Sequence, residues 1–227
     1  MRLVTAMILA AGRGERMRPL TDHCPKPLLK VGGKPLIEYH IEALKQAGIE
    51  RVVINHAWLG EQFPEILGNG SRFGVELLYS AEQTALETAG GIINAMPLLC
   101  ADSRTDYFVV VNGDIFSDFD FSRLPQALGH DLAHLVMVAN PEHNPQGDFA
   151  YTRGRLQPGQ ADKLTFSGIA VYHQAFFAGL QEGALALAPL LRNFIGQDRV
   201  SAQLHRGRWC DVGTPERLAM LNQQENN

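Results

Sequence analysis

The feature that most constrains the fold is a short apolar segment that runs directly into a long, basic loop. Residues 5–10 read TAMILA, and a short apolar run that stops near glycine predicts a buried β-strand. Residues 12–34 follow with three prolines, and this polar segment is too long to be a plain connector. A buried strand that ends in such a loop is typical of α/β proteins, in which ligands bind beyond the carboxyl ends of the strands.

Strands and helices are expected to alternate along the rest of the first half. A helix should begin at Pro35 and end at Gly48, because proline and glycine favour these two ends of a helix. Further strands are expected at residues 51–55, 75–80 and 107–111, and further helices at residues 58–67 and 88–96. Short strands separated by helices predict a doubly wound, mostly parallel sheet flanked by helices.

The second half is less regular but contains no linker, repeat or clear boundary. Strands are expected at residues 132–139, 149–153, 164–172 and 200–205, and helices at residues 176–180, 187–195 and 215–221. The chain of 227 residues is long enough to bury a sizeable core. We therefore expect one α/β domain over residues 1–227.

Charge is concentrated in the long loop. The whole chain carries a formal net charge of −4, which gives no indication of a nucleic-acid surface. Between residues 12 and 34, six basic residues face only two acidic ones, Glu15 and Asp22; the basic residues are Arg13, Arg16, Arg18, Lys26, Lys30 and Lys34. A basic loop in an acidic chain predicts a small, highly charged anion as the ligand.

The three cysteines and the hydropathy pattern indicate a cytoplasmic protein. Cys24, Cys100 and Cys210 are odd in number and far apart, so neither a disulfide nor a zinc framework is expected. The first apolar run leads into the basic loop instead of a cleavage site, and no apolar stretch approaches the roughly 20 residues needed to span a bilayer. Neither nucleic acid nor membrane is expected as a partner, and nothing in the sequence indicates the oligomeric state.

The start of the loop has the residues of a phosphate-binding turn. Glycines at positions 12 and 14 allow backbone N–H groups to approach a phosphate closely. The loop has neither the third glycine of the dinucleotide fingerprint, since Met17 occupies that place, nor the Gly-Lys-Ser/Thr of the Walker loop. For Gly12 and Gly14 alone, a solvated surface loop is an equally good interpretation.

Lys26 stands between Pro25 and Pro27. Both prolines restrict the flanking backbone dihedral angles. A lysine on such a stiff segment favours a positioned cation over a solvated one.

Two aspartates are candidates for metal binding. Asp114 follows an apolar strand and Asn112-Gly113, while Asp211 precedes Val212-Gly213-Thr214 and an expected helix. Magnesium takes one or two carboxylates and assists phosphoryl chemistry. For Asp114 alone a strand-end turn is as good an interpretation, and the spacing does not pair it with Asp211. We expect the histidines His40, His56 and His205 on the surface and not as ligands.

Together these motifs resemble a known family. Residues 9–27, LAAGRGERMRPLTDHCPKP, resemble the signature of the sugar-1-phosphate nucleotidyltransferases, and residues 34–39, KPLIEY, resemble the helix start that follows it there. Residues 112–114 and 209–214 resemble that family's two metal-binding aspartate motifs. The resemblance covers nearly the whole chain and implies a Rossmann-like sheet of the glycosyltransferase-A type.

The resemblance also implies a reaction and assigns residues to it. A sugar 1-phosphate would attack UTP with Mg²⁺ bound by Asp114 and Asp211. Residues 1–114 would mainly bind the nucleotide, through Ala10, Ala11, Gly12, Gly14, Glu15, Arg16, Lys26, Glu82 and Gly90. Residues 115–227 would mainly bind the sugar phosphate. The residues that would contact it are Asn112, from the first half, and Asn140, Gly168 and Thr214. Arg16, Lys26, Asp114 and Asp211 would be the catalytic residues.

Substrate choice within the family is open at this point. Residues 54–60, 86–92 and 164–169 resemble uridylyltransferases of bacterial cell-wall recycling, and Glu87 stands where mannose and glucose enzymes usually carry glycine. The alternatives are guanylyltransferases for mannose or heptose 1-phosphate and uridylyltransferases for glucose 1-phosphate. A catalytically silent nucleotide-binding regulatory subunit is the alternative that is not an enzyme.

Overall fold

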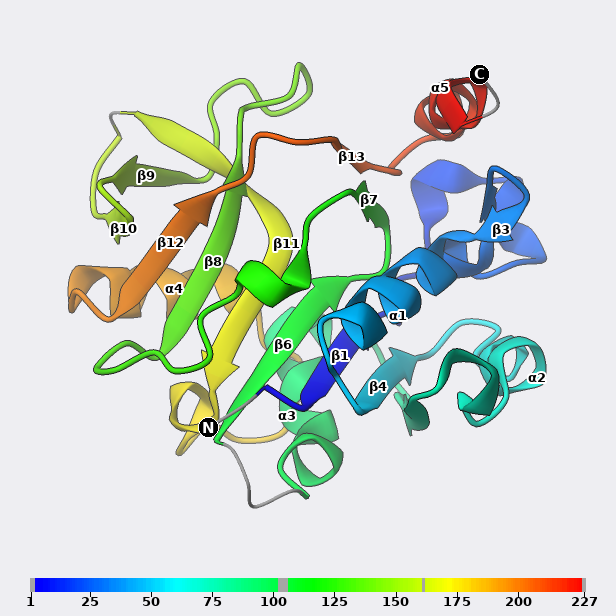
Figure 1. Cartoon of the computed structure of the whole chain (residues 1–227), viewed down its shortest axis with the longest axis horizontal. Coiled ribbons are helices and arrows are strands. Elements are labelled where there is room, and N and C mark those ends of the chain that lie inside the picture. Colours follow the sequence, from blue (N-terminus) through cyan, green and yellow to red (C-terminus); the bar gives the residue numbers. More distant parts are fainter. Residues whose placement is uncertain (1–2, 102–105, 161, 226–227) are drawn as a thin grey trace.

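The centre of the protein is a nine-stranded mixed sheet (Figure 1). The computed structural model describes residues 3–101, 106–160 and 162–225. The strands are β1 (Thr5–Leu9), β4 (Arg51–His56), β5 (Glu76–Ala81), β6 (Tyr107–Asn112), β8 (Ala133–Val138), β9 (Phe149–Thr152), β10 (Arg155–Gln157), β11 (Lys163–His173) and β12 (Val200–Leu204). Their order across the sheet is β5-β4-β1-β6-β11-β8-β12-β10-β9. The expected α/β architecture, a sheet flanked by helices, is present, but the sheet as a whole is mixed instead of mostly parallel.

The parallel arrangement is complete only in the first half of the chain. Strands β5, β4, β1 and β6 are parallel neighbours, as the sequence predicts. In the second half β11 runs antiparallel to both β6 and β8, and β10 runs antiparallel to both β12 and β9. The β9–β10 connection has positive φ at Arg153 and Gly154, the backbone of a tight hairpin turn. Such a turn leaves no room for the crossover helix that parallel strands require.

Helices cover both faces of the sheet. α1 (Leu36–Gln46) and α2 (Gln62–Leu67) lie on one face, and α3 (Glu87–Leu99) and α4 (Leu187–Gly196) lie on the other. The strand β1 supplies both layers, because Ala6 and Ile8 pack toward α1 whereas Met7 packs toward α3. Alternate residues of a strand point to opposite faces, so burial on both sides explains its continuous apolar sequence.

The last helix packs against the basic loop. α5 (Pro215–Glu225) lies beside the short hairpin of β2 (Lys30–Val31) and β3 (Lys34–Pro35), as Figure 1 shows at the end marked C. Leu218 and Leu221 pack in one cluster with Val31, and Asn222 accepts a hydrogen bond from Gly32 N at 2.9 Å. The basic loop is therefore held by the C-terminal segment.

Some expectations about local structure were wrong. The second helix begins at Gln62 instead of residue 58, because residues 58–61 form turns around Gly60. The segment expected as a helix at residues 176–180 is a 3₁₀ turn over Gln174–Phe177 instead, with the side chain of His173 accepting from Ala175 N at its start. Three short 3₁₀ turns, Glu15–Met17, Leu20–Asp22 and Lys26–Leu28, give the basic loop a defined shape.

The three histidines expected on the surface are buried. His40, His56 and His205 are each less than a tenth exposed. Two have clear polar partners, since His40 Nε2 lies 2.8 Å from Ile115 O and His205 Nε2 lies 2.9 Å from Asp118 Oδ1. A buried imidazole is tolerated when it is hydrogen-bonded, and sequence position alone did not reveal these partners.

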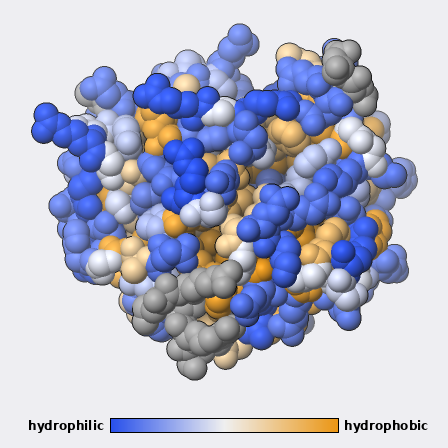
Figure 2. All heavy atoms as spheres, viewed as in Figure 1, coloured by the Kyte–Doolittle hydropathy of each residue, from blue (hydrophilic) through white to orange (hydrophobic). Residues whose placement is uncertain are grey.

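The surface in the view of Figure 2 is mostly hydrophilic, with apolar residues visible in the gaps. Among the residues that the structure describes, no helix is long and apolar enough to cross a membrane. The three cysteines are free thiols.

Candidate active site

A cavity of about 540 Å³ opens where β1 and β6 end. Its lining combines the loop after β1, the start of α3 and the residues that follow β6. The lining residues are Leu9, Ala10, Ala11, Gly12, Gly14, Glu15, Arg16, Met17, Lys26, Pro27, Asn55, Glu82, Ala85, Leu86, Glu87, Thr88, Asn112, Asp114 and Gly213. All the predicted nucleotide-binding residues except Gly90 are therefore brought together at the carboxyl edge of the sheet.

The loop after β1 is a built structure. Gly14 has φ 68°, which only glycine adopts readily, and a Cβ there would approach Thr21 Cγ2 to 2.9 Å. Thr21 Oγ1 donates to Gly14 O at 2.8 Å. Arg13 turns away to stack on the ring of Trp58, 4.0 Å from its centroid. This geometry favours a built loop over a solvated surface loop, and of these two arginines Arg16 lines the cavity whereas Arg13 does not.

Lys26 is held against Asp114. Its Nζ lies 2.7 Å from Asp114 Oδ2, and the lysine side chain is only 9% exposed. The 3₁₀ turn Lys26–Leu28 places it there, while Gly113 N donates to Leu9 O at 2.9 Å and joins the ends of β6 and β1. The stiff segment predicted around Lys26 thus carries a positioned cation.

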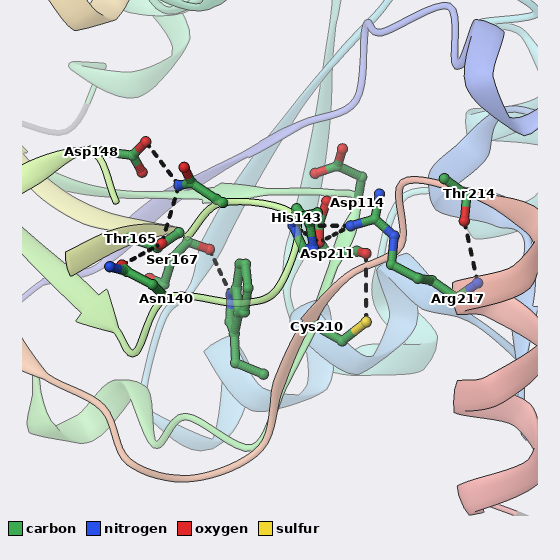
Figure 3. Close-up of polar contacts among 12 residues, drawn as sticks. Asp114, Asn140, His143, Asp148, Thr165, Ser167, Cys210, Asp211, Thr214 and Arg217 are labelled. Atoms are coloured by element: carbon green, nitrogen blue, oxygen red, sulfur yellow. Dashed lines mark hydrogen bonds and ion pairs between the residues drawn. The ribbon is translucent and has the colours of Figure 1, made fainter. Parts of the chain in front are cut away.

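Asp211 ends a short strand that pairs with the strand directly after Asp114. The strand β13 (Trp209–Asp211) pairs antiparallel with β7 (Ile115–Ser117), and Asp211 is opposite Ile115. Val212 N donates to Asp114 O at 2.8 Å, and Figure 3 shows both carboxylates in one region. The fold therefore joins two aspartates that spacing could not pair.

A basic loop with glycines, a buried lysine and two aspartates brought into one region form a site suited to phosphates and a divalent cation. A sequence model of the nucleotidyl transferase family matches residues 5–153. This chain belongs to the nucleotidyl transferase family. The family expected from the sequence motifs is confirmed.

Two curated relatives narrow the comparison. The chain is 52% identical to the N-acetylmuramate alpha-1-phosphate uridylyltransferase of Neisseria meningitidis serogroup B over 94% of both chains. It is 39% identical to the mannose-1-phosphate guanylyltransferase catalytic subunit beta of Drosophila melanogaster over 93% of this chain, which spans 60% of that protein.

The fold also matches a solved structure. A Bacillus anthracis protein described as a glucose-1-phosphate thymidylyltransferase superposes with a TM-score of 0.86 at 21% identity, covering 99% of this chain and 96% of that chain. At that identity the likeness shows the fold alone.

In this nucleotidyl transferase each of the two aspartates already has a cationic partner. Lys26 pairs with Asp114, and Arg217 Nη1 donates to Asp211 Oδ1 at 2.5 Å. His143 Nε2 lies 2.8 Å from the same oxygen (Figure 3). Sequence reasoning missed Arg217 and His143. Arg217 follows Asp211 by six residues at the start of a helix, which was an available signal, whereas no signal marked His143.

The donor set fits magnesium. Asp114 and Asp211 offer hard carboxylate oxygens, and Mg²⁺ is commonly bound by one or two carboxylates together with substrate phosphates. Among the described residues no group of three or more His, Cys, Asp or Glu side chains could hold a metal ion. Two carboxylates leave the remaining positions of an octahedral Mg²⁺ to water and substrate phosphates.

Asn55 is a third site residue that sequence reasoning missed. Its Oδ1 accepts from Ala10 N at 2.9 Å and its Nδ2 donates to Glu82 Oε1 at 2.6 Å. Glu82 Oε2 accepts from Leu86 N at 3.4 Å. Asn55 thus links the phosphate loop to the segment before α3. Its place near the carboxyl end of β4 was the available signal.

Gly90 lies outside the cavity lining. Its N donates to Leu185 O at 3.2 Å, and a Cβ there would collide with the backbone of Gly183. The glycine therefore serves close packing of α3 against the segment before α4, and its role in base recognition stays a prediction.

The predicted sugar-phosphate residues are only partly brought together. Asn112 lines the cavity, and Gly168, with φ 84°, lies against it, because a Cβ there would be 2.7 Å from Asn112 Nδ2. Thr214 Oγ1 accepts from Arg217 N at 3.4 Å. Asn140 is engaged elsewhere, since it donates to Lys163 O at 2.9 Å and accepts from Thr165 Oγ1 at 2.9 Å. Contacts of these residues with the sugar phosphate stay predictions.

Buried His40 supports the strand that follows Asp114. Burial lowers the pKa of His40 from 6.5 to about 4, against the smaller opposing effects of the Ile115 hydrogen bond and the Asp114 charge. The imidazole is therefore neutral near pH 7, with Nε2–H donating to Ile115 O. This contact anchors β7 to α1 directly beside the candidate metal ligand.

Proposed function

We propose that this chain transfers the uridylyl group of UTP to N-acetylmuramate 1-phosphate, forming UDP-N-acetylmuramate and pyrophosphate. The observation that carries the proposal is the 52% identity, over 94% of both chains, with the Neisseria protein that bears this activity in its name. The cavity supports it with the glycine-containing loop after β1, buried Lys26 and Asp114, and Asp211 lies on the strand that pairs with the residues after Asp114. We further propose that the reaction serves peptidoglycan recycling in the cytoplasm.

In the proposed reaction the triphosphate lies along residues 10–16. A phosphate oxygen of the sugar 1-phosphate forms a bond to the α-phosphorus of UTP. The bond from that phosphorus to the α,β-bridging oxygen breaks, and pyrophosphate leaves with the electron pair. The second pKa of a phosphate monoester is about 6, so the nucleophile is ionised at neutral pH. No general base is needed, and positioning and charge neutralisation are the protein's task.

Each of the candidate site residues has a part in this task. Lys26 would bring the two reacting phosphates together, and Arg16 would bind the leaving pyrophosphate. Asp114 and Asp211 would hold Mg²⁺, which supplies charge neutralisation at the phosphates when bound. Asn55 would keep the phosphate loop and Glu82 in register, because it hydrogen-bonds both.

The substrate assignment is tested by pyrophosphate release across a matrix of nucleotides and sugars. UTP, GTP, CTP and dTTP are each combined with N-acetylmuramate, mannose, heptose and glucose 1-phosphates. The proposal predicts the highest kcat/KM for UTP with N-acetylmuramate 1-phosphate. A preference for GTP with mannose 1-phosphate would favour the activity named in the Drosophila relative. No pyrophosphate from any pair would favour a nucleotide-binding regulatory subunit.

A further inference from the structure

We propose that Arg217 binds the phosphate of the sugar substrate. Without a divalent cation, Arg217 is paired with Asp211, and it becomes available to the phosphate when a cation binds the Asp211 carboxylate. The inference rests on the proposed function, since it concerns how the second substrate is bound. It adds a substrate-binding residue from the C-terminal helix to the proposed function. It also sets an order, in which the divalent cation binds Asp211 before Arg217 binds the sugar phosphate.

The first observation is the shielded ion pair itself. Arg217 lies in the first turn of α5, and its Nη1 is 2.5 Å from Asp211 Oδ1. The two side chains are only 19% and 22% exposed. A pair this shielded is screened much less than a surface pair, so it holds the guanidinium in one place.

The second observation is that the surroundings are shaped around this guanidinium. His143 Nε2 lies 3.0 Å from Arg217 Nη1 and 2.8 Å from Asp211 Oδ1. The guanidinium lies over Gly213, where a Cβ would collide with it and would approach Asp211 Oδ2 to 3.0 Å. Gly213 also lines the cavity. Figure 3 shows Arg217 reaching from α5 toward Asp211. Arg217 is not itself a lining residue, but it packs directly against Gly213, which is one.

The third observation is the parallel with Lys26. Each candidate metal ligand is neutralised by one cation, Asp114 by Lys26 and Asp211 by Arg217. A divalent cation on the two carboxylates would repel both side chains at short range. The carboxylates would in addition lose their attraction for the two cations, because the metal neutralises them. Both side chains would then be released toward the nearest anions, which are the substrate phosphates.

The position of Arg217 in the chain favours contact with the sugar phosphate over contact with UTP. Lys26 belongs to the loop after β1, where the triphosphate is proposed to lie, whereas Arg217 comes from the C-terminal segment together with Asp211. A planar guanidinium binds phosphate oxygens in pairs. Arg217 would thus fix the orientation of the attacking phosphate.

The decisive variant is Arg217→Gln, studied with two independent readouts. Mn²⁺ binding is measured by electron paramagnetic resonance without substrates, and the KM values for both substrates are measured by pyrophosphate release. We expect Mn²⁺ to bind about tenfold more tightly, because its competitor for Asp211 is gone. The KM for the sugar 1-phosphate should rise roughly tenfold to a hundredfold, the range expected for one charge-assisted hydrogen bond. The KM for UTP should change less than about twofold, since Arg217 makes no contact with the loop after β1 in this proposal.

Arg208→Gln is the matched control. Arg208 lies near Asp211 in sequence but pairs with Glu225 and stacks 5.3 Å from the ring centroid of Phe116. This variant should leave Mn²⁺ affinity and both KM values at wild-type levels. Arg217→Lys keeps the charge and should restore wild-type Mn²⁺ affinity while recovering only part of the sugar-phosphate affinity, because lysine lacks the paired donors.

Two results would overturn the inference. One is an Arg217→Gln variant whose Mn²⁺ affinity is unchanged or weaker. The other is an equal rise in the KM values of both substrates. The Mn²⁺ titration needs no substrate, so it stays informative if N-acetylmuramate 1-phosphate proves to be the wrong sugar. In that case the KM comparison is made with whichever sugar 1-phosphate the wild-type protein uses.

Discussion

Lys26 Nζ lies 2.7 Å from Asp114 Oδ2, although 88 residues separate the two in the sequence. The lysine side chain is 9% exposed and the aspartate side chain 39%, and both residues line the cavity. The charge pair joins the loop after β1 to the end of β6. The anion-binding part and the metal-binding part of the site are therefore one unit before any ligand arrives.

Lys26→Met should lower kcat/KM by about 10²–10³-fold, the usual loss when one preorganised charge donor is removed from a reacting centre. The methionine keeps most of the buried stem, so the fold should persist. Pyrophosphate release measures the effect. Lys34→Met is the control, because Lys34 forms a partly exposed pair with Glu42. A Lys26→Met variant with wild-type kcat and only a raised KM for UTP would argue against a role in the transition state.

Asn55→Leu should destabilise the protein by about 2–6 kcal/mol. The change removes the partners of Ala10 N and of Glu82 Oε1, and each buried polar group left unpaired costs roughly 1–3 kcal/mol. Urea unfolding followed by circular dichroism gives the value.

Two comparisons sharpen the Asn55 prediction. Asn94→Ala, which removes a part-buried hydrogen bond to Ser80, should cost less than about 1.5 kcal/mol. Adding Glu82→Leu to Asn55→Leu should recover part of the loss, because both polar partners are then replaced by apolar groups. A double variant that is less stable than Asn55→Leu by the full cost of a second independent change would contradict the pairing.

His40 should make stability depend on pH below neutrality. Its pKa is about 4 in the folded protein and 6.5 when exposed, so the unfolded chain binds the extra proton between these values. The contribution of neutral His40 to the free energy of unfolding is present above pH 6.5 and is lost as the pH falls toward 4. Between pH 7 and pH 5 this amounts to about 2 kcal/mol.

The comparison that isolates His40 is with His40→Gln, whose amide can still donate to Ile115 O. The free energy of unfolding of the wild type should fall by about 2 kcal/mol more than that of the variant over this interval. Equal pH dependence in both proteins would show that the pKa of His40 is the same in the folded and unfolded states.

The parts that local pattern predicts well are the parallel strands and the stiff segment around Lys26. A continuous apolar run such as β1, buried on both faces, carries its signal in its own residues. The proline-flanked Lys26 is similarly local, because backbone restriction comes from its immediate neighbours. These features were predicted from the sequence with nearly correct boundaries.

The parts that local pattern could not predict depend on tertiary contacts. The β13–β7 pairing that joins Asp211 to the strand after Asp114 spans almost the whole second half of the chain. The roles of Asn55, Arg217 and His143 arise only when distant strand ends meet. Gly90 is a different case. Its sequence context predicts contact with the nucleotide, whereas in the structure it allows α3 to pack closely against the backbone of Gly183.

The central claim, nucleotidyl transfer by attack at the α-phosphorus, is tested most directly by following isotopic label. The protein is incubated with Mg²⁺ and N-acetylmuramate 1-phosphate together with either α-³²P-labelled or γ-³²P-labelled UTP, and the products are separated chromatographically. The account predicts α-label only in UDP-N-acetylmuramate and γ-label only in pyrophosphate, with both signals lost in Asp114→Asn. Transfer of the γ-label to the sugar, or no labelled sugar nucleotide from the wild-type protein, would contradict it.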